Sequence, residues 1–166
     1  MGRDKSRLRL GRSTFLGQIK RTAAQLHLPI RVIRKDLIPN CGPLSGAFTG
    51  LKKSKVDAVL FLSCDMPFVG VELLRRLIAT ASGRREAVFV STNGVPGFPF
   101  VLPATALPVL ERMLGEGRRS LWMLAKKLAA RKVRVRGPAR ELMNINTPDE
   151  LVIARRSVPR PRLTRR

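Results

Sequence analysis

The chain has 166 residues, of which 44% are hydrophobic, and this is enough apolar content to bury the core of one globular domain. No run approaches the roughly 18 apolar residues of a membrane helix, and the basic start lacks the apolar stretch of a secretory signal, so we expect a cytoplasmic protein without a membrane partner. The chain has two distant cysteines and one histidine, His27, which argues against a disulfide framework, a zinc site and a histidine-based hydrolase. The formal net charge of +22 favours polyanionic partners.

Helices and strands are predicted to alternate along the chain. The predicted helices cover 13–26, 43–53, 72–81, 104–114, 120–130 and 148–153, and the predicted strands cover 30–33, 58–62, 87–90, 98–102 and 132–135. Ser13 is the expected N-cap of the first helix, and Thr147 and Pro148 are the expected N-cap and first residue of the last. The continuous apolar run at 58–62 is typical of a strand covered on both faces, which makes it the candidate central strand. This pattern predicts a doubly wound α/β sheet whose ligands gather at the carboxyl ends of the strands.

A carboxylate directly follows the candidate central strand. Asp65 lies in the tetrapeptide CDMP at 64–67, so the strand would deliver it to the ligand-binding edge of the sheet. A hard anionic oxygen at this place suits Mg²⁺ bridging nucleotide phosphates, because Mg²⁺ commonly takes one or two protein carboxylates and completes its shell with phosphate and water. From strand and position alone, a turn aspartate ahead of a proline explains the residue equally well.

Two glycine-containing stretches could approach phosphates or a nucleoside. Lys5 lies near Gly2, ahead of the first helix, where a positive charge and backbone N–H groups could face phosphates, although a basic N-terminus is usually only solvated. The stretch CGPLSG at 41–46 places Gly42 where the backbone could approach a base or sugar, and a helix-opening turn accounts for this glycine equally well. Neither stretch identifies a ligand by itself.

The positive charge is densest at the C-terminal end of the chain. Arginines are frequent from residue 155 onward, and the prolines at 159 and 161 forbid a continuous helix there. A solvated, disordered tail over 157–166 is favoured over a nucleic-acid arm. Basic residues are not interleaved with aromatic ones, so the sequence does not support a nucleic-acid partner.

Four short blocks follow one another along the chain. They are MGRDK at 1–5, Asp36 followed by GPLSG at 42–46, CDMPF at 64–68, and NINTPDEL at 144–151. In order and spacing they resemble the molybdenum cofactor guanylyltransferase family, whose pattern runs LAGGxSxRMGxDK, an aspartate before GPLxG, CDMPF, and NxNTPxDL. The resemblance implies a Rossmann-like, doubly wound, mostly parallel sheet of the nucleotide-diphospho-sugar transferase type. The Asp4 and Lys5 pair together with NINTP leans toward guanine, since cytidylyl-transferring relatives usually carry Asn before the lysine.

The same resemblance implies a reaction and a set of site residues. The reaction is transfer of GMP from Mg-GTP to molybdopterin carrying molybdenum, with pyrophosphate leaving, and molybdoenzyme maturation proteins are further candidate partners. By block matching, the catalytic residues are Lys5 and Asp65, the nucleotide-binding residues are Gly2, Lys5, Asp36, Gly42 and Asp65, the substrate-binding residues are Asn144 and Asn146, and the Mg²⁺ ligand is Asp65. Positioning and electrostatics dominate such phosphate chemistry, so no protein base is obligatory.

The chain departs from the family pattern at its beginning. It starts at the methionine of RMG, without the family's first strand and the LAGGxSxR half of the phosphate loop, so we expect a transferase domain over 1–156 that lacks this strand and a true start upstream of Met1. Neighbouring strands would then expose unpaired edges. Two other readings stay open: an inactive fragment, or a basic accessory protein that binds acidic partners. Within the enzyme class, a CTP- or sugar-phosphate-using nucleotidyltransferase is the alternative, separable by the nucleotide that stabilises the fold.

Overall fold

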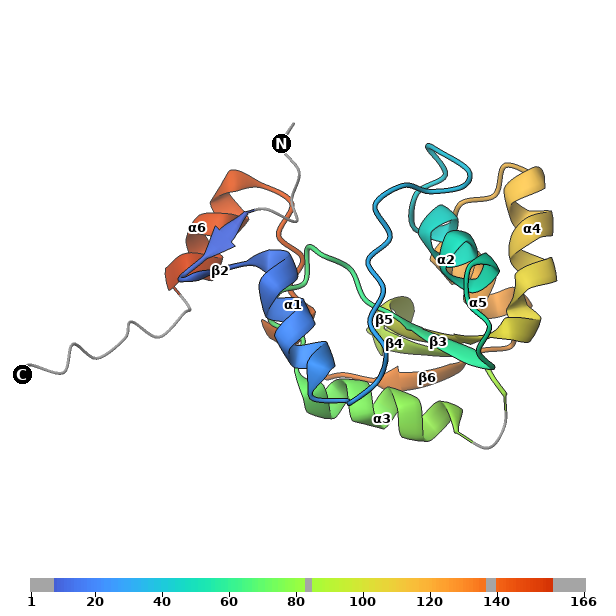
Figure 1. The fold of residues 1–166 in the computed structure, drawn as a ribbon, viewed down its shortest axis with the longest axis horizontal. Helices are drawn as coiled ribbons and strands as arrows, with labels where there is room; N and C mark the ends of the chain where they lie inside the picture. Colours follow the sequence, from blue (N-terminus) through green and yellow to red (C-terminus); the bar gives the residue numbers. More distant parts are fainter. Residues whose placement is uncertain (1–7, 83–84, 137–139, 157–166) are drawn as a thin grey trace, which may run out of the picture.

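The computed structural model describes residues 8–82, 85–136 and 140–156. Within them, a four-stranded sheet has the order β3–β5–β4–β6 (Figure 1). Its strands are β3 (Ala58–Phe61), β4 (Val88–Thr92), β5 (Val95–Pro103) and β6 (Arg131–Arg134). β5 is antiparallel to both of its neighbours and β4 is parallel to β6, so β3, β4 and β6 run in one direction. The predicted α/β class with a mostly parallel sheet is confirmed.

Helices cover both faces of this sheet (Figure 1). One face packs against α2 (Pro43–Lys52), α4 (Leu107–Gly115) and α5 (Leu121–Lys127), and the other packs against α1 (Phe15–Ala24) and α3 (Val71–Ala81). Successive side chains of a strand point to opposite faces, so in β4 Phe89 joins the first core while Val88 and Val90 join the second. Phe89 and Phe61 stack on Phe100 from either side, with ring centroids 4.8 and 5.1 Å apart, which links three adjacent strands.

A third apolar cluster lies beside the sheet. It joins the short hairpin β1 (Arg9–Leu10) and β2 (Ser13–Thr14) to α6 (Pro148–Arg156). Its buried members are Leu10, Phe15, Ile145, Leu151 and Ala154, with Leu8, Phe68 and Met143 packed against them. Two short 3-10 helices, η2 (Ala104–Ala106) and η3 (Arg140–Leu142), precede α4 and this closing segment. The beginning and the end of the described chain therefore share one core (Figure 1).

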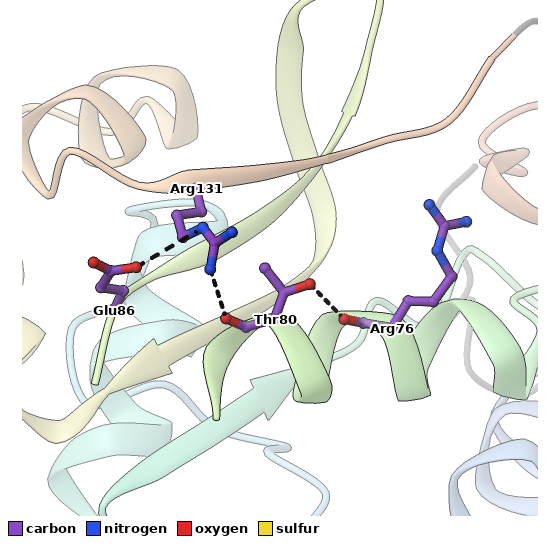
Figure 2. Close-up of polar contacts among 4 residues, drawn as sticks. All are labelled: Arg76, Thr80, Glu86 and Arg131. Carbon is purple, nitrogen blue, oxygen red and sulfur yellow. Dashed lines mark hydrogen bonds and ion pairs between the residues drawn. The ribbon is translucent and has the colours of Figure 1, made fainter. Parts of the chain in front are cut away.

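Polar contacts also tie β6 to α3 and to the start of β4 (Figure 2). Nη1 of Arg131 donates a 3.3 Å hydrogen bond to the carbonyl oxygen of Thr80 in α3, and its Nε lies 3.9 Å from Oε2 of Glu86. The Thr80 hydroxyl donates a 2.7 Å bond to the carbonyl oxygen of Arg76, one turn earlier in α3. Because side chains alternate along β6, Arg131 faces α3 while the next residue, Lys132, faces the α5 side.

The start of the first helix differs from the prediction. Helix α1 begins at Phe15, and its N-cap is Thr14, whose hydroxyl oxygen accepts a 3.0 Å hydrogen bond from the N–H of Gly17. Ser13 was the wrong choice by one residue: both Ser13 and Thr14 pair in the hairpin, and the helical backbone begins only at Phe15. Two serine or threonine residues in a row offer the same cap chemistry, and the residue at which the helix begins decides between them.

The segment 30–33 does not form the predicted strand. A strand needs a ladder partner, and among the described residues no strand pairs with 30–33. Side chains hold the segment instead: the Arg31 guanidinium donates to the carbonyl oxygen of Lys53, and Ile33 packs against Gly50 of α2. The run at 58–62, which was expected to be the central strand, is β3, and β3 is an outer strand of the described sheet because no strand pairs with its second edge there.

The other predicted elements are present with shifted ends. The helices predicted from Pro43 and Glu72 are α2 and α3, and the last helix begins at Pro148 as expected. The strand predicted at 98–102 is the longer β5, which returns antiparallel after a tight turn at Asn93 and Gly94, both with positive φ. Across the described residues, no helix is long and apolar enough to span a membrane.

Candidate active site

Asp65 lies in the turn that follows the carboxyl end of β3, as the sequence predicts. It is half-buried, between the exposed Cys64 and the buried Met66 and Pro67. The hydroxyl of Ser63 donates a 2.5 Å hydrogen bond to its Oδ1, which fixes the orientation of the carboxylate. Sequence reasoning missed Ser63, although a hydroxyl two residues before an aspartate in a turn is a recognisable signal.

A main-chain hydrogen bond joins the turn at Asp65 to the last sequence block. The N–H of Ile145 donates a 2.8 Å bond to the carbonyl oxygen of Asp65. Ile145 is fully buried in the third cluster, whereas Asn144 and Asn146 on either side of it are exposed. The structure therefore brings the backbone at both asparagines to the turn that carries Asp65, so these two blocks are neighbours in space.

The backbone around Asn146 is held by a capping box at the start of α6. Oε2 of Glu150 accepts hydrogen bonds from the N–H groups of Asn146, at 2.6 Å, and Thr147, at 2.9 Å. In return, the Thr147 hydroxyl oxygen accepts a 3.2 Å bond from the N–H of Glu150. This reciprocal pattern confirms Thr147 as the N-cap. Glu150 thus holds the backbone at Asn146, a contact that the sequence prediction missed although the spacing TPDE signals it.

Helix η3 packs against the same turn from the side. The guanidinium carbon of Arg140 lies 4.4 Å from the centroid of the Phe68 ring, a cation–π contact. A Cβ at Gly70 would lie 3.2 Å from Oε2 of Glu141, so the chain approaches η3 closely there. The phenylalanine of the CDMPF block thus anchors the turn between η3 and the third cluster.

The second group of predicted residues surrounds the start of α2. A Cβ at Gly46 would lie 3.8 Å from Oδ1 of Asp36, which places this carboxylate beside the first turn of the helix. The N–H of Leu37 donates a 2.9 Å bond to the hydroxyl oxygen of Thr49. Gly42 is the N-cap residue of α2 and has a φ of 62°, a conformation that favours glycine. Asp36 and Gly42 therefore belong to one local structure, and their contacts share no residue with those of Asp65.

Two predicted residues, Gly2 and Lys5, lie outside the described residues. The described chain begins at Leu8, whose carbonyl oxygen accepts a 2.9 Å bond from the N–H of Phe15. Leu8 packs against the third cluster, which also contains Ile145 and receives Phe68. The described N-terminal segment thus contacts the same core as the CDMPF block, which contains Asp65, and the NINTPDEL block.

Asp65 provides a limited set of ligands for a cation. Among the described residues, no group of three or more His, Cys, Asp or Glu side chains is placed to hold a metal ion. A cage made only of protein ligands is therefore not built in this part of the chain. One carboxylate beside open solvent does fit Mg²⁺ carried in with a nucleotide, since that ion usually keeps several waters and binds through one or two carboxylates plus phosphates.

Comparison with known proteins decides the family. Residues 1–133 match the model of the MobA-like NTP transferase domain, which is most of the chain. The chain belongs to this family. It is 31% identical over 153 residues to a molybdenum cofactor guanylyltransferase of Pseudomonas putida, and the match covers 77% of this chain and 80% of the relative. The protein is accordingly a nucleotidyltransferase.

Solved structures agree with this assignment at the level of the fold. Molybdopterin-guanine dinucleotide biosynthesis protein A from Archaeoglobus fulgidus superposes with a TM-score of 0.70 at 21% identity, covering 93% of this chain and 90% of that protein. A Mycobacterium tuberculosis protein solved in complex with manganese superposes with a TM-score of 0.66 at 20% identity, covering 94% of both chains. The sheet and helices of this nucleotidyltransferase are thus arranged as in both structures.

Proposed function

We propose that this nucleotidyltransferase transfers GMP from GTP to molybdopterin carrying molybdenum and releases pyrophosphate. The observation that supports the proposal best is the hydrogen bond between Ile145 and Asp65, because it places a candidate metal ligand beside two candidate substrate-binding asparagines. The guanylyltransferase of Pseudomonas putida, similar over most of both chains, supports the same substrates. The sequence pattern of the four blocks supports guanine over cytosine.

The reaction is a substitution at the α-phosphorus of GTP. A terminal phosphate oxygen of the pterin substrate forms a bond to this phosphorus, and the bond to the oxygen that bridges to the β-phosphate breaks. Bound at Asp65, Mg²⁺ would supply charge neutralisation for the nucleotide phosphates. Asp65, held by Ser63, would keep that charge in place, and the neighbour solved with manganese supports the use of a divalent cation. Lys5 would add positive charge to the triphosphate, as matched by its sequence block.

The guanosine part would contact the start of α2. Asp36 lies beside Gly46 and offers an acceptor for the N–H groups of guanine or the hydroxyls of ribose. At Gly42 nothing lies within 4 Å of the position that a Cβ would take, so the backbone there is open to close approach by a ligand. Asn144 and Asn146, both exposed, would present donors and acceptors to the pterin substrate.

The test is nucleotide binding and turnover by the full chain with a matched pair of variants. The thermal midpoint is measured with Mg²⁺ and GTP, CTP or ATP in turn, and pyrophosphate release is followed after adding molybdenum-loaded molybdopterin. We expect a GTP-selective rise of the midpoint and GTP-dependent pyrophosphate release. Asp65→Asn should abolish the Mg²⁺-dependent part of the rise and lower turnover by about 10²-fold or more.

Asp57→Asn is the control because Asp57 is exposed and precedes the opposite end of β3. It should leave the GTP response unchanged. A CTP-selective response would replace the guanylyl reaction with a cytidylyl one. No response to any nucleotide, with the fold intact, would leave the inactive or accessory reading in its place.

A further inference from the structure

A cleft of about 200 Å³ lies on the α5 side of the sheet, away from the residues described at Asp65. Its apolar lining includes Trp122, Ala125, Ala129 and Ala130. The Trp122 side chain is 50% exposed, an unusual state for the largest apolar side chain in the chain. The described contacts of Asp65 and Asn146 include none of these residues, so an occupant of the cleft would not displace one at the active site.

Two lysines give the cleft its charge. Lys126 and Lys132 line it, from α5 and β6 respectively. Nζ of Lys126 lies 5.4 Å from the centroid of the Trp122 ring, and Nζ of Lys132 donates a 3.3 Å bond to the carbonyl oxygen of Gly94. Within the described part of the chain, the ion pairs involve other residues, so neither ammonium group faces a carboxylate.

Arg131, which precedes Lys132 in β6, differs from it in what its side chain contacts. Arg131 points to the other face, where it contacts Thr80 and Glu86 (Figure 2). The Arg131 guanidinium on the α3 side therefore contacts a carbonyl oxygen and a carboxylate of the same chain. The Lys132 ammonium on the α5 side has one neutral acceptor, the carbonyl oxygen of Gly94. Positive charge beside an apolar cleft attracts an anionic partner, and the net charge of +22 strengthens the attraction.

The size of the cleft selects among anionic partners. A volume of about 200 Å³ is less than the roughly 300 Å³ at which small-molecule sites begin, and it suits one apolar side chain better than a whole nucleotide. Tryptophan is also among the residues that most often carry binding energy in protein interfaces.

We propose that this cleft docks an acidic segment of a partner protein. An apolar side chain of the segment packs against the alanines and Trp122 that line the cleft, and carboxylates on either side of it pair with Lys126 and Lys132. Interaction through a basic field with acidic proteins was one of the readings left open by the sequence, and the cleft gives it a defined place. The docking surface is independent of the reaction proposed above.

Trp122 makes the test direct because it is the only tryptophan in the chain and there is no tyrosine. The full chain is titrated with a synthetic peptide that has one leucine between two runs of glutamate, and with the same peptide carrying serine instead. We expect a saturable shift of the tryptophan emission with the leucine peptide and about tenfold weaker binding of the serine peptide. Equal affinity for the two peptides would overturn the proposal, because only general charge attraction would remain.

Charge-reversal variants complete the test. Lys126→Glu should weaken binding of the leucine peptide by about tenfold or more, and Lys127→Glu, the adjacent exposed lysine outside the cleft lining, by less than about threefold. Lys132→Glu is a second variant from a different element, used if Lys126→Glu lowers the thermal midpoint. Equal effects of Lys126→Glu and Lys127→Glu would contradict the proposal. So would an emission shift caused by GTP or inorganic phosphate and absent with the peptide.

Discussion

A Cβ placed on Gly50 would lie 2.5 Å from Cε1 of Phe61, so the backbone of α2 at this glycine packs directly on the Phe61 ring of β3. Phe61 cannot easily yield, because its ring stacks on Phe100 in the core. We expect Gly50→Ala to lower the free energy of unfolding by about 1–3 kcal/mol through overpacking, despite the better helix propensity of alanine. Urea unfolding measures this. Gly115→Ala in α4, where nothing lies within 4 Å, should change the stability by less than about 1 kcal/mol.

Ser91 and Ser45 form a matched pair of buried hydroxyls. Ser91 is 2% exposed and its Oγ has no hydrogen-bond partner in the described part of the structure, whereas Ser45 is 0% exposed and donates to the carbonyl oxygen of Ile38. Removing an unpaired buried hydroxyl costs nothing in lost bonds, so Ser91→Ala should raise the free energy of unfolding by up to about 1 kcal/mol. Ser45→Ala should lower it by about 1 kcal/mol. Chemical denaturation of both variants gives the comparison, and a loss of stability in Ser91→Ala would contradict the prediction.

The capping box at α6 should affect the substrate asparagines. Glu150→Ala removes the acceptor of the N–H groups of Asn146 and Thr147, which leaves the site intact in composition but loosens the backbone at Asn146. We expect a loss of about 1 kcal/mol in stability and a severalfold higher KM for the pterin substrate, with KM for GTP unchanged. Steady-state kinetics with each substrate varied in turn separates the two constants. Asp149→Ala, an exposed neighbour in the same turn, is the control.

The Arg131 contacts in Figure 2 should contribute little to stability. The side chains of Arg131 and Glu86 are 47% and 42% exposed and their charged atoms are 3.9 Å apart, so solvent screens the pair. Yet Oε2 of Glu86 is itself buried and without a hydrogen bond in the described structure. A double-mutant cycle with Arg131→Ala and Glu86→Ala, measured by urea unfolding, should give a coupling energy below about 1 kcal/mol. A coupling well above this value would mean that the buried oxygen is poorly solvated.

Several features of the candidate site could be predicted because they depend on near neighbours in the chain. Asp65 follows an apolar strand, and such a strand ends at the ligand edge of an α/β sheet. Thr147 and Glu150 cap α6 across a single turn. Gly42 precedes α2 with a positive φ, which glycine adopts without strain. In each case the interaction spans only a few residues, so the sequence alone contains it.

Other features could not be predicted in this way. The segment 30–33 has the residues of a strand but no ladder partner, and Ser13 has the chemistry of a cap but lies one residue before the position at which the helix needs it. The pairing of a strand and the exact start of a helix depend on how the backbone groups bond in the folded chain. Local propensity does not contain that information.

The sequence by itself determined the helices, the apolar strands and the residue types available at Asp65 and at Asn144 and Asn146, since periodicity and turn chemistry act over a few residues. The tertiary structure alone decided that β5 returns antiparallel between β3 and β4, that Ile145 bonds to Asp65, and that Trp122 borders a cleft with two lysines. These arrangements depend on which distant apolar faces are buried together. That choice is made by the packing of the whole chain.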